Sequence, residues 1–321
     1  MRIARFAQGG DARVGIVGDG TLVPLRPGID VLDLLPAGPA ERDRIVADAT
    51  DGDPVALDDV RLLAPLQPPT IRDFVTFEEH VEGVVRSVGA DATVVPEWYE
   101  APQFYFTNPH AVLGPADDVP IPPGCEMLDF ELEVAAIVGR AGRDVAPAAA
   151  RDLIAGYTIF NDWSARDLQR REMRVGLGPA KGKDTANTLG PWVVTADELE
   201  LYRRDGRLDL DLRVAINGTP FGDDSLANMG WSFEEMLAYA SRGTWVRPGD
   251  VLGSGTCGSG CLAEIWGRRG AIDPPPLGPG DVVTITVEAI GTLSSTLVAG
   301  ADPVPVPRAR PATRRRRPWG A

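Results

Sequence analysis

Ile154–Lys183, IAGYTIFNDWSARDLQRREMRVGLGPAKGK, is the stretch that indicates both the fold and a candidate site. Its apolar start, Ile154–Phe160, predicts a buried strand, and the polar residues that follow place Asp162 at the end of that strand. The GLGPAKGK run cannot continue a helix, because glycine and proline interrupt helical structure. It therefore predicts a loop that brings Lys183 back as a loop residue.

A short helix is expected directly after the strand, because Ser164 and Asp167 are spaced as in a capping box. Arg166 and Gln169 are three residues apart on this helix and share a face, so both can point towards whatever Asp162 holds. An acid, a guanidinium and an amide gathered in this way are typical of an active site. A solvated surface helix rich in charges gives the same pattern, and spacing alone leaves both interpretations open.

Two glutamates in Leu128–Gly139, LDFELEVAAIVG, extend the candidate site. Glu131 and Glu133 are two residues apart in a β-type run, so they project from one face, while Leu132 and Val134 project from the other. Ordinary polar alternation on a surface sheet would look the same. The apolar continuation AAIVG instead predicts a strand that enters the core, where paired carboxylates have raised pKa values or need a cation.

The segment 71–89, IRDFVTFEEHVEGVVRSVG, has apolar residues at roughly helical spacing, and His80 lies among them. A single histidine on such a stretch is more often structural than catalytic. Asp73 precedes the helical spacing, which begins at Phe74, and can cap the helix or act as a ligand. The aromatic and proline-rich run 96–114 fits a loop or an edge that walls a pocket better than a helix interior.

A glycine-rich run, GSGTCGSGCLAEIWG, covers residues 253–267. It resembles an anion-binding loop, but it lacks the GK[ST] and GxGxxG patterns, so neither a P-loop nor a dinucleotide site is supported. A flexible β-turn is the simpler interpretation. Thr256 and Glu264 are nevertheless close enough in sequence to line one site.

The remaining sequence predicts a small β-rich unit over residues 1–70, with a helix near Arg42–Ala49 and a proline-rich exit. Further signals predict a hairpin, an amphipathic helix and two turns that each lead into a strand: Asn217–Gly218, Ser232–Ser241, Pro248–Val251 and Pro279–Val282.

Charge and composition limit the function classes. A chain of 321 residues with 44% hydrophobic residues can bury a large core. The net charge of −14 argues against nucleic acid as the main partner. The tail Arg308–Ala321 carries six arginines and no acid, so residues 1–307 have a charge of −20. Such a tail is predicted to be disordered, although it could bind an anionic partner.

The start of the chain has no long apolar run, and no segment is long enough to span a bilayer, so we expect a cytoplasmic protein without membrane contact. The three cysteines form no CxxC pair, and His80 and His110 are the two histidines. A bound metal must therefore rely on oxygen ligands, which favours magnesium, calcium or manganese.

Four separated motifs together resemble the fumarylacetoacetate hydrolase family over about residues 70–300: DFELEVAAIVG, NDWSARDLQ, the GLGPAKGK loop and GSGT followed by the glutamate of LAE. The resemblance implies a mixed β-rich α+β fold, with a catalytic domain built as a β-sandwich roll and a small N-terminal β-rich unit. It also implies a homodimer and a divalent metal ion, with magnesium favoured and calcium or manganese as alternatives. We expect the N-terminal domain and linker at 1–70, the catalytic domain at 71–307 and the basic tail at 308–321.

The resemblance also implies roles for eleven residues, carried over by matching position. The metal ligands would be Asp73, Glu131, Glu133 and Asp162. His80 would be the catalytic base with Glu264 as its orienting acid, and Lys183, Arg166 and Gln169 would complete the catalytic set. Substrate contacts would come from Tyr105, Thr256, Arg166 and Gln169. His80 thereby changes from a structural to a functional candidate.

Three positions depart from the family pattern. Val75 and Met173 stand where the eponymous hydrolase has tyrosines that contact its substrate, and Asn187 stands where a threonine near the metal is expected. The N-terminal unit is also shorter. The motifs therefore support the chemistry better than they support fumarylacetoacetate as the substrate.

The function that the resemblance implies is hydrolysis of a carbon–carbon bond in a 1,3-dicarbonyl acid, such as fumarylacetoacetate or an acylpyruvate, by a water that His80 and Glu264 activate. The substrate is expected to be a small carboxylate. The alternative is a metal-enolate decarboxylase, tautomerase, isomerase or hydratase acting on a 2-oxo acid of an aromatic-degradation or biosynthetic pathway. A non-enzymatic binding module that recruits a partner through the basic tail is the third hypothesis.

Overall fold

The computed structural model of the chain describes residues 1–86 and 93–311. Residues 308–311 have no regular structure, and the rest of the tail that we predicted to be disordered lies outside the described residues. Within those two ranges, no helix has both the length and the apolar character that a membrane span requires.

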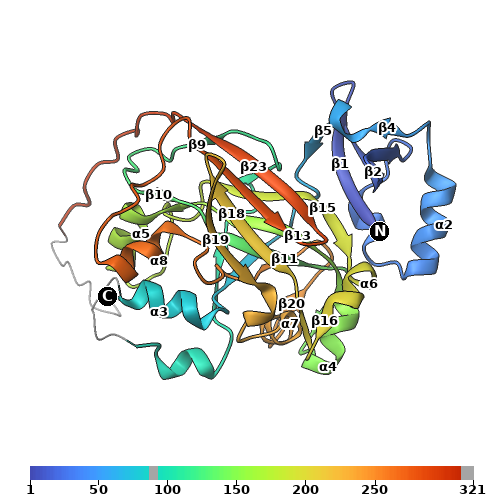
Figure 1. Ribbon diagram of the computed structural model, residues 1–321. Coiled ribbons are helices and arrows are strands. Elements are labelled where there is room, and N and C mark those ends of the chain that lie inside the picture. The colour runs from blue at the N-terminus through green and yellow to red at the C-terminus, as the bar shows by residue number, and fades with distance from the viewer. Residues whose placement is uncertain (87–92, 312–321) are drawn as a thin grey trace, which may run out of the picture.

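A twelve-stranded mixed sheet runs through the molecule (Figure 1). Ten strands follow the order β4-β3-β2-β1-β15-β13-β11-β21-β6-β7, while β5 pairs with β1 and β8 pairs with β15. Their bounds are β1 Arg2–Gln8, β2 Asp11–Gly18, β3 Thr21–Pro24, β4 Val55–Ala56, β5 Arg61–Leu63, β6 Ile71–Phe74, β7 Phe104–Thr107, β8 Val112–Leu113, β11 Leu132–Val138, β13 Ile154–Asp162, β15 Asn187–Thr195 and β21 Val251–Gly253.

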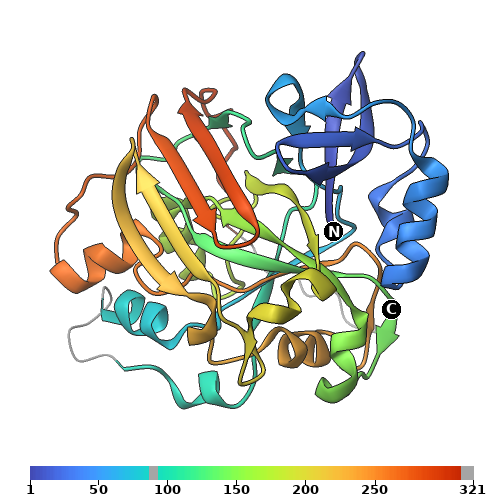
Figure 2. The same ribbon diagram turned by 45° about the vertical axis from the view of Figure 1, so that its right-hand side comes forward.

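A second sheet of five strands has the order β19-β18-β22-β23-β9, and Figure 2 shows its four long strands side by side in yellow and red. Their bounds are β9 Val119–Pro120, β18 Asp211–Ile216, β19 Thr219–Ser225, β22 Val282–Val287 and β23 Gly291–Val298. The predicted Asn217–Gly218 hairpin joins β18 to β19, and both of its residues have the positive φ that a tight hairpin needs. The two predicted Pro-Gly-Asp-Val turns lead into β21 and β22, as expected.

Shorter elements lie between the strands of the two sheets along the chain. Three two-stranded ribbons pair β10 Leu128–Asp129 with β14 Ser164–Ala165, β12 Gly142–Arg143 with β20 Trp245–Val246, and β16 Arg203–Arg204 with β17 Arg207–Leu208. The α-helices are α1 Val31–Leu34, α2 Pro39–Ala49, α3 Glu78–Arg86, α4 Pro147–Ala150, α5 Arg166–Met173, α6 Ala196–Leu199, α7 Phe233–Ala240 and α8 Leu262–Arg269. Single 3₁₀ turns are η1 Leu57–Asp59, η2 Pro96–Tyr99, η3 Arg151–Leu153, η4 Glu200–Tyr202 and η5 Leu226–Asn228. The helices α2 and α7 confirm the predictions near Arg42–Ala49 and Ser232–Ser241.

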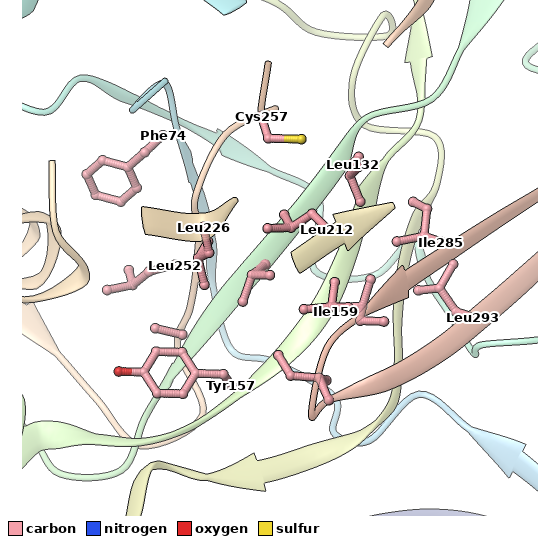
Figure 3. Close-up of a cluster of buried hydrophobic side chains, with 14 of the residues drawn as sticks. Phe74, Leu132, Tyr157, Ile159, Leu212, Leu226, Leu252, Cys257, Ile285 and Leu293 are labelled. Atoms are coloured by element: carbon pink, nitrogen blue, oxygen red, sulfur yellow. The ribbon is translucent and has the colours of Figure 1, made fainter. Parts of the chain in front are cut away.

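The main hydrophobic core lies between the two sheets (Figure 3). Leu132 and Ile159 from the large sheet meet Leu212, Ile285 and Leu293 from the small one. The alternate face of β11 is buried too, because Ala135 and Ile137 belong to a second core that includes residues of the N-terminal strands. The predicted β-rich sandwich is therefore confirmed, and its central strand β11 is buried on both faces.

The N-terminal strands do not form a sheet of their own. Strand β1 pairs with β15 in the register Arg2↔Val194 and Ile3↔Val193, so the first strands extend the large sheet of the catalytic region. The small N-terminal β-rich unit is present, but it is joined to the rest by backbone hydrogen bonds as well as by the chain. The division at residue 70 stays a prediction.

Two local predictions were wrong. The predicted capping box at Ser164 does not form: Ser164 lies in β14, its hydroxyl donates to the Asp162 carbonyl, and the helix begins at Arg166 without a side-chain cap. The helix that the apolar spacing from Phe74 predicted begins only at Glu78, because Phe74 ends strand β6, which pairs in parallel with β21. Both errors arise because pairing with strands far away in the sequence overrides a local signal.

Helices α3, α5 and α8 lie together at the end of the sandwich away from the N-terminal strands (Figures 1 and 2). The predicted buried strand is β13, which ends at Asp162, and the predicted glycine-rich loop follows α5. The edge strand β7 carries the aromatic run that we expected to form a wall. These elements bring the sequence motifs to one end of the sheets.

Candidate active site

A cavity of about 960 Å³ lies at this end of the sandwich. Eight of the eleven predicted site residues line it: Asp73, His80, Tyr105, Glu131, Arg166, Gln169, Lys183 and Thr256. The other three, Glu133, Asp162 and Glu264, are fully buried and contact residues of this set from behind. The structure therefore brings together residues that are up to 191 positions apart in the sequence.

A group of carboxylates forms the inner part of the site. Oxygen atoms of Asp73, Glu131 and Glu133 lie within 4.8 Å of one another. Strand β6 supplies Asp73, β11 supplies Glu133, and Glu131 directly precedes β11. The side chain of Asn161 accepts the Glu131 backbone N–H at 2.9 Å, which fixes the chain where it enters β11. Asp162, at the end of β13, is tied to the same group through Lys183.

The pKa values of these acids reflect their crowding. Burial, followed by the charge of Asp162, raises the pKa of Asp73 well above its usual range. Burial and the charge of Asp73 do the same to the pKa of Glu133. Burial also raises the pKa of Asp162, to about 6, although Lys183 opposes this shift. Ionising all of these groups together is thus unfavourable without more positive charge.

The donor set fits a hard divalent cation. One oxygen each of Asp73, Glu133 and Asp162 is buried without a hydrogen-bond partner among the described residues. Buried carboxylate oxygens are costly to leave unpartnered, and a cation satisfies several of them at once. Magnesium, manganese and calcium prefer oxygen ligands of this kind. The clustered carboxylates of Asp73, Glu131 and Glu133 therefore fit such an ion, and Asp162 offers a further unpartnered oxygen.

Two buried cations hold the outer side of the carboxylate group. The Lys183 ammonium donates to Glu131 Oε2 and to Asp162 Oδ2, at 2.6 Å each. The Arg166 guanidinium donates to Glu131 Oε1 and to Asp129 Oδ2, at 2.8 Å each. Burial works against ionisation of Glu131, but the charges of Lys183 and Arg166 outweigh it and lower the pKa of this carboxyl. Glu131 consequently stays ionised.

His80 and Glu264 form a pair at the other side of the cavity. The Nδ1 atom of His80 lies 3.3 Å from Glu264 Oε2. The other carboxylate oxygen accepts the Ser259 backbone N–H at 2.9 Å and pairs with Arg268 one helical turn further along α8. Glu264 is fully buried and His80 is 8% exposed, so the histidine faces the cavity while the acid stays behind it. This is the geometry of a base with an orienting acid.

The remaining predicted contacts also border the cavity. The Tyr105 hydroxyl donates to Asp162, and Gln169 accepts from Arg166 at 3.2 Å. Thr256 is buried in the loop after β21. The neighbouring Gly255 has a φ of +76°, and a Cβ there would lie 2.3 Å from the Phe74 carbonyl oxygen, so only glycine fits.

The three positions that depart from the family pattern lie at the cavity or beside the loop that carries Lys183. Val75 and Met173 both line the cavity, so this chain has apolar side chains at two positions on the cavity wall. The amide nitrogen of Asn187 donates to Thr107, whose hydroxyl in turn donates to the Lys183 carbonyl at 2.6 Å. Asn187 therefore helps to fix the loop that carries Lys183.

The sequence did not reveal the residues that position the site. Asp129 accepts from Arg166 and from the backbone N–H groups of Leu262 and Ala263, so it joins α5 to the start of α8. The one sequence signal for Asp129 is its position two residues before Glu131, which in a β-type run would place both side chains on the same face. Gly83 was not identified, because its contact with Glu264 depends on how α3 packs against α8. The role of Arg268, four residues after Glu264 on α8, was not predicted either.

Comparison with known proteins gives two family matches. Residues 70–298 match the C-terminal model of fumarylacetoacetate (FAA) hydrolase, and residues 1–65 match the N-terminal model described as Rv2993c-like. Among curated proteins, the chain is 33% identical over 252 residues to Protein Rv2993c of Mycobacterium tuberculosis, covering 77% of this chain and 82% of that one. It is 30% identical over 244 residues to the oxaloacetate tautomerase YisK of Bacillus subtilis, covering 75% and 74% of the two chains.

A solved structure of a fumarylacetoacetate hydrolase is also similar to this chain. The fumarylacetoacetate hydrolase of Exiguobacterium antarcticum superimposes with a TM-score of 0.71 at 28% identity, over 93% of this chain and 99% of that one. The likeness thus extends over both the N-terminal strands and the region that holds the cavity.

Proposed function

The chain belongs to the fumarylacetoacetate hydrolase family, and we propose that it hydrolyses the carbon–carbon bond between the two carbonyl groups of a 1,3-dicarbonyl acid of the acylpyruvate or fumarylacetoacetate type. The observation that carries this proposal is the His80–Glu264 pair, which borders the same cavity as the carboxylate group. A base held by an orienting acid serves to activate water. The carboxylate group serves to bind the chelating end of an oxo acid through a metal ion.

Asp73, Glu131, Glu133 and Asp162 are the proposed ligands of a divalent cation, with magnesium favoured over manganese and calcium. When bound, such an ion polarises the two oxygens of a 1,3-dicarbonyl or 2-oxo acid and stabilises the negative charge that develops there. The protein itself supplies the closed, buried donor set and the two cations beside it.

His80 is the proposed base that activates water. Its Nδ1 atom faces the Glu264 carboxylate, so the neutral ring carries its proton on Nδ1 and keeps Nε2 as the base. Nε2 takes a proton from water, and the water oxygen bonds to C4, the acyl carbonyl carbon of an acylpyruvate substrate. The bond between C3 and C4 then breaks with its electron pair left on C3, which gains a proton. The products are the carboxylic acid of the acyl group and pyruvate or its analogue, so water is the sole co-reactant.

Lys183, Arg166 and Gln169 are the proposed partners of the oxygen that becomes negative during this attack. Lys183 and Arg166 are buried and already ordered by Glu131, so they need little rearrangement as charge develops. One well-placed donor of this kind contributes roughly 3–4 kcal/mol to lowering the barrier. Tyr105 and Thr256 are the proposed neutral contacts of the substrate.

A second candidate function is tautomerisation of a 2-oxo acid, which the similarity to the B. subtilis oxaloacetate tautomerase favours. It uses the same carboxylate group and a proton transfer, but no water attacks the substrate. Decarboxylation and hydration of an oxo acid belong to the same group of alternatives. The His80–Glu264 pair favours hydrolysis, since simple enolate chemistry does not require an activated water.

The test of the proposed function is turnover of a small acylpyruvate panel with magnesium or manganese, followed by the loss of enol absorbance and by mass analysis of the products. Hydrolysis is expected to give two acid fragments in equal amounts. An isomer of the substrate, or a product that has lost carbon dioxide, would instead support the second candidate.

We expect the active form to be a cytoplasmic homodimer.

Metal binding is expected to stabilise the folded chain. At a concentration 100 times its Kd, a cation adds about 2.7 kcal/mol to the free energy of unfolding, which corresponds to roughly 5 °C in Tm for a chain of this size. Thermal unfolding with magnesium, manganese or chelator measures this shift. Glu133→Gln should abolish the shift, whereas Glu41→Gln on the exposed face of α2 should leave it unchanged. An equal shift in both variants would contradict the ligand assignment.

The shift in Tm is also expected to depend on pH. The pKa of Asp162 is about 6 in the folded chain against an ordinary value of 3.8, so the folded state binds its proton more tightly than the unfolded state. Without metal, this group's contribution to the free energy of unfolding therefore falls as the pH rises through that window. A metal ion that binds Asp162 must displace its proton. The rise in Tm that the metal causes should therefore be larger at pH 7.5 than at pH 5.

A further inference from the structure

The cavity has an apolar side that the proposed chemistry does not use. Six side chains, here called the apolar wall, form it: Met127, Met173, Ala263, Trp266, Ala271 and Ile272. They come from the segment before β10, the end of α5, and α8 with the residues after it. The polar groups proposed for the reaction come from β6, β7, β11, β13, α3, the start of α5 and the loops of Lys183 and Thr256, with Glu264 behind His80 on α8. The site thus combines a polar reacting end with an apolar extension.

The apolar wall is suited to contact with a ligand. Trp266 donates its indole N–H to the Pro274 carbonyl at 2.6 Å, so its ring has no hydrogen bond left to offer and lines the cavity with carbon atoms. Met173 and Ile272 are 53% and 57% exposed although they line the cavity. Exposed apolar side chains that gather at a cavity are typical of a binding surface.

The charges of the cavity argue against a second carboxylate at the far end of the substrate. The buried cations Arg166 and Lys183 are already paired with acids of the site. Among the described residues that line the cavity, the other basic side chain besides His80 is Arg170, which is exposed to solvent at the end of α5. A distal carboxylate that lay against the apolar wall would therefore lose water with no buried cation to receive it, which is unfavourable.

We propose that the substrate is a 2,4-dioxo acid whose acyl group is an extended alkyl or aryl chain, and that the apolar wall binds this chain. The proposal rests on the proposed function for the reacting end of the molecule. It adds the chemical nature of the other end: apolar, and longer than an acetyl group. A cavity of about 960 Å³ has room for such a chain beside the dioxo acid.

The first test is the specificity constant for acylpyruvates with unbranched acyl chains of increasing length. Each methylene that leaves water for the wall is expected to raise kcat/KM by about fourfold, until the wall is covered. A chain of equal length that ends in a carboxylate should lose this gain. A flat series, or a preference for the substrate with the terminal carboxylate, would overturn the proposal.

Met173→Lys is the matching variant, because it places a cation on the wall at a position exposed enough to accept one without unfolding. It should remove most of the gain with chain length and raise activity on the carboxylate-ended substrate. Leu177→Lys is the control, since Leu177 is 91% exposed and does not line the cavity. Equal effects of the two variants would contradict a role for the wall.

A binding measurement separates this proposal from the proposed function. Calorimetric titration of unbranched 2-oxo acids, which have no 4-oxo group to be cleaved, gives dissociation constants in the presence of magnesium. If affinity rises with chain length in wild type and not in Met173→Lys, the wall binds the chain even if no acylpyruvate is hydrolysed. If acylpyruvates are hydrolysed but chain length changes neither affinity nor kcat/KM, the proposed function stands and the inference about the chain fails.

Discussion

Replacing His80 with alanine is expected to lower kcat by a hundred- to ten-thousand-fold, roughly the range that a positioned general base contributes. The change in KM should be much smaller, because within residues 1–86 and 93–311 the side-chain partners of His80 are Glu264 and Cys261, and neither is a proposed metal ligand or Lys183. His80 is 8% exposed and its Nδ1 atom lies 3.3 Å from Glu264. Steady-state kinetics on the best acylpyruvate of the panel measures both constants.

His110→Ala is the matched control for this experiment. It removes the other histidine of the chain, which is exposed and does not line the cavity, so kcat should stay at the wild-type value. The stabilisation by metal should persist in His80→Ala, which shows that the carboxylate group is intact. If His80→Ala still converts the substrate at the wild-type rate and the product is an isomer, the proposed hydrolysis by an activated water is wrong. The tautomerase alternative then takes its place.

The sequence predicted those parts of the fold in which local pattern and tertiary structure agree. Strand β13 was predictable because an apolar run ends in two polar residues, and both faces of this strand are buried. The turns before β21 and β22 were predictable because proline, glycine and aspartate determine the backbone by themselves. In each case the residues that make the signal also make the structure.

The wrong predictions share a physical cause. Ser164 has the spacing of a helix cap, but its backbone pairs with Asp129 in the β10–β14 ribbon. Phe74 fits the helical period of the residues after it, but it belongs to β6, which pairs with β7 on one side and with β21 on the other. The small N-terminal unit is present as predicted, but the pairing of β1 with β15 that joins it to the large sheet was not predicted. None of these partners can be identified from the segment itself.

The candidate site shows the same division. Residues whose chemistry is visible in their type, such as Glu131, Lys183 and His80, could be proposed from motifs and family resemblance. Residues that act by position could not, because Asp129 and Gly83 have ordinary surroundings in sequence and gain their roles only from packing. Gly83 lies in helix α3, where glycine is intrinsically unfavourable, and that is a reason to ask what it allows.

The structure shows what Gly83 allows. A Cβ atom at this position would lie 2.3 Å from Glu264 Cγ and 3.2 Å from Glu264 Cδ. Glu264 has no room to retreat, since it is fully buried and its carboxylate is held by Ser259, Arg268 and His80. Helix α3 thus approaches α8 closely enough to place His80 against Glu264 only because residue 83 has no side chain.

Gly83→Ala is therefore expected to lower kcat by about a hundredfold, the effect of displacing a catalytic group by roughly 1 Å. The helix itself should gain, because alanine is about 1 kcal/mol better than glycine in a helix interior, so a loss of kcat will not reflect a weaker α3. Steady-state kinetics together with thermal unfolding separates the two effects. Gly38→Ala, at a position where a Cβ meets nothing within 4 Å, should leave kcat unchanged.

A double-mutant cycle decides whether Gly83 acts through Glu264. Glu264→Ala removes Cγ and Cδ and leaves only Cβ, at 3.4 Å from the new methyl group, which is ordinary contact. In that background Gly83→Ala should no longer lower kcat, so the double variant should be about as active as Glu264→Ala alone. If the two losses instead multiply, Gly83 acts on the site by another route. The close contact between α3 and α8 would then be a matter of packing and not of orienting His80.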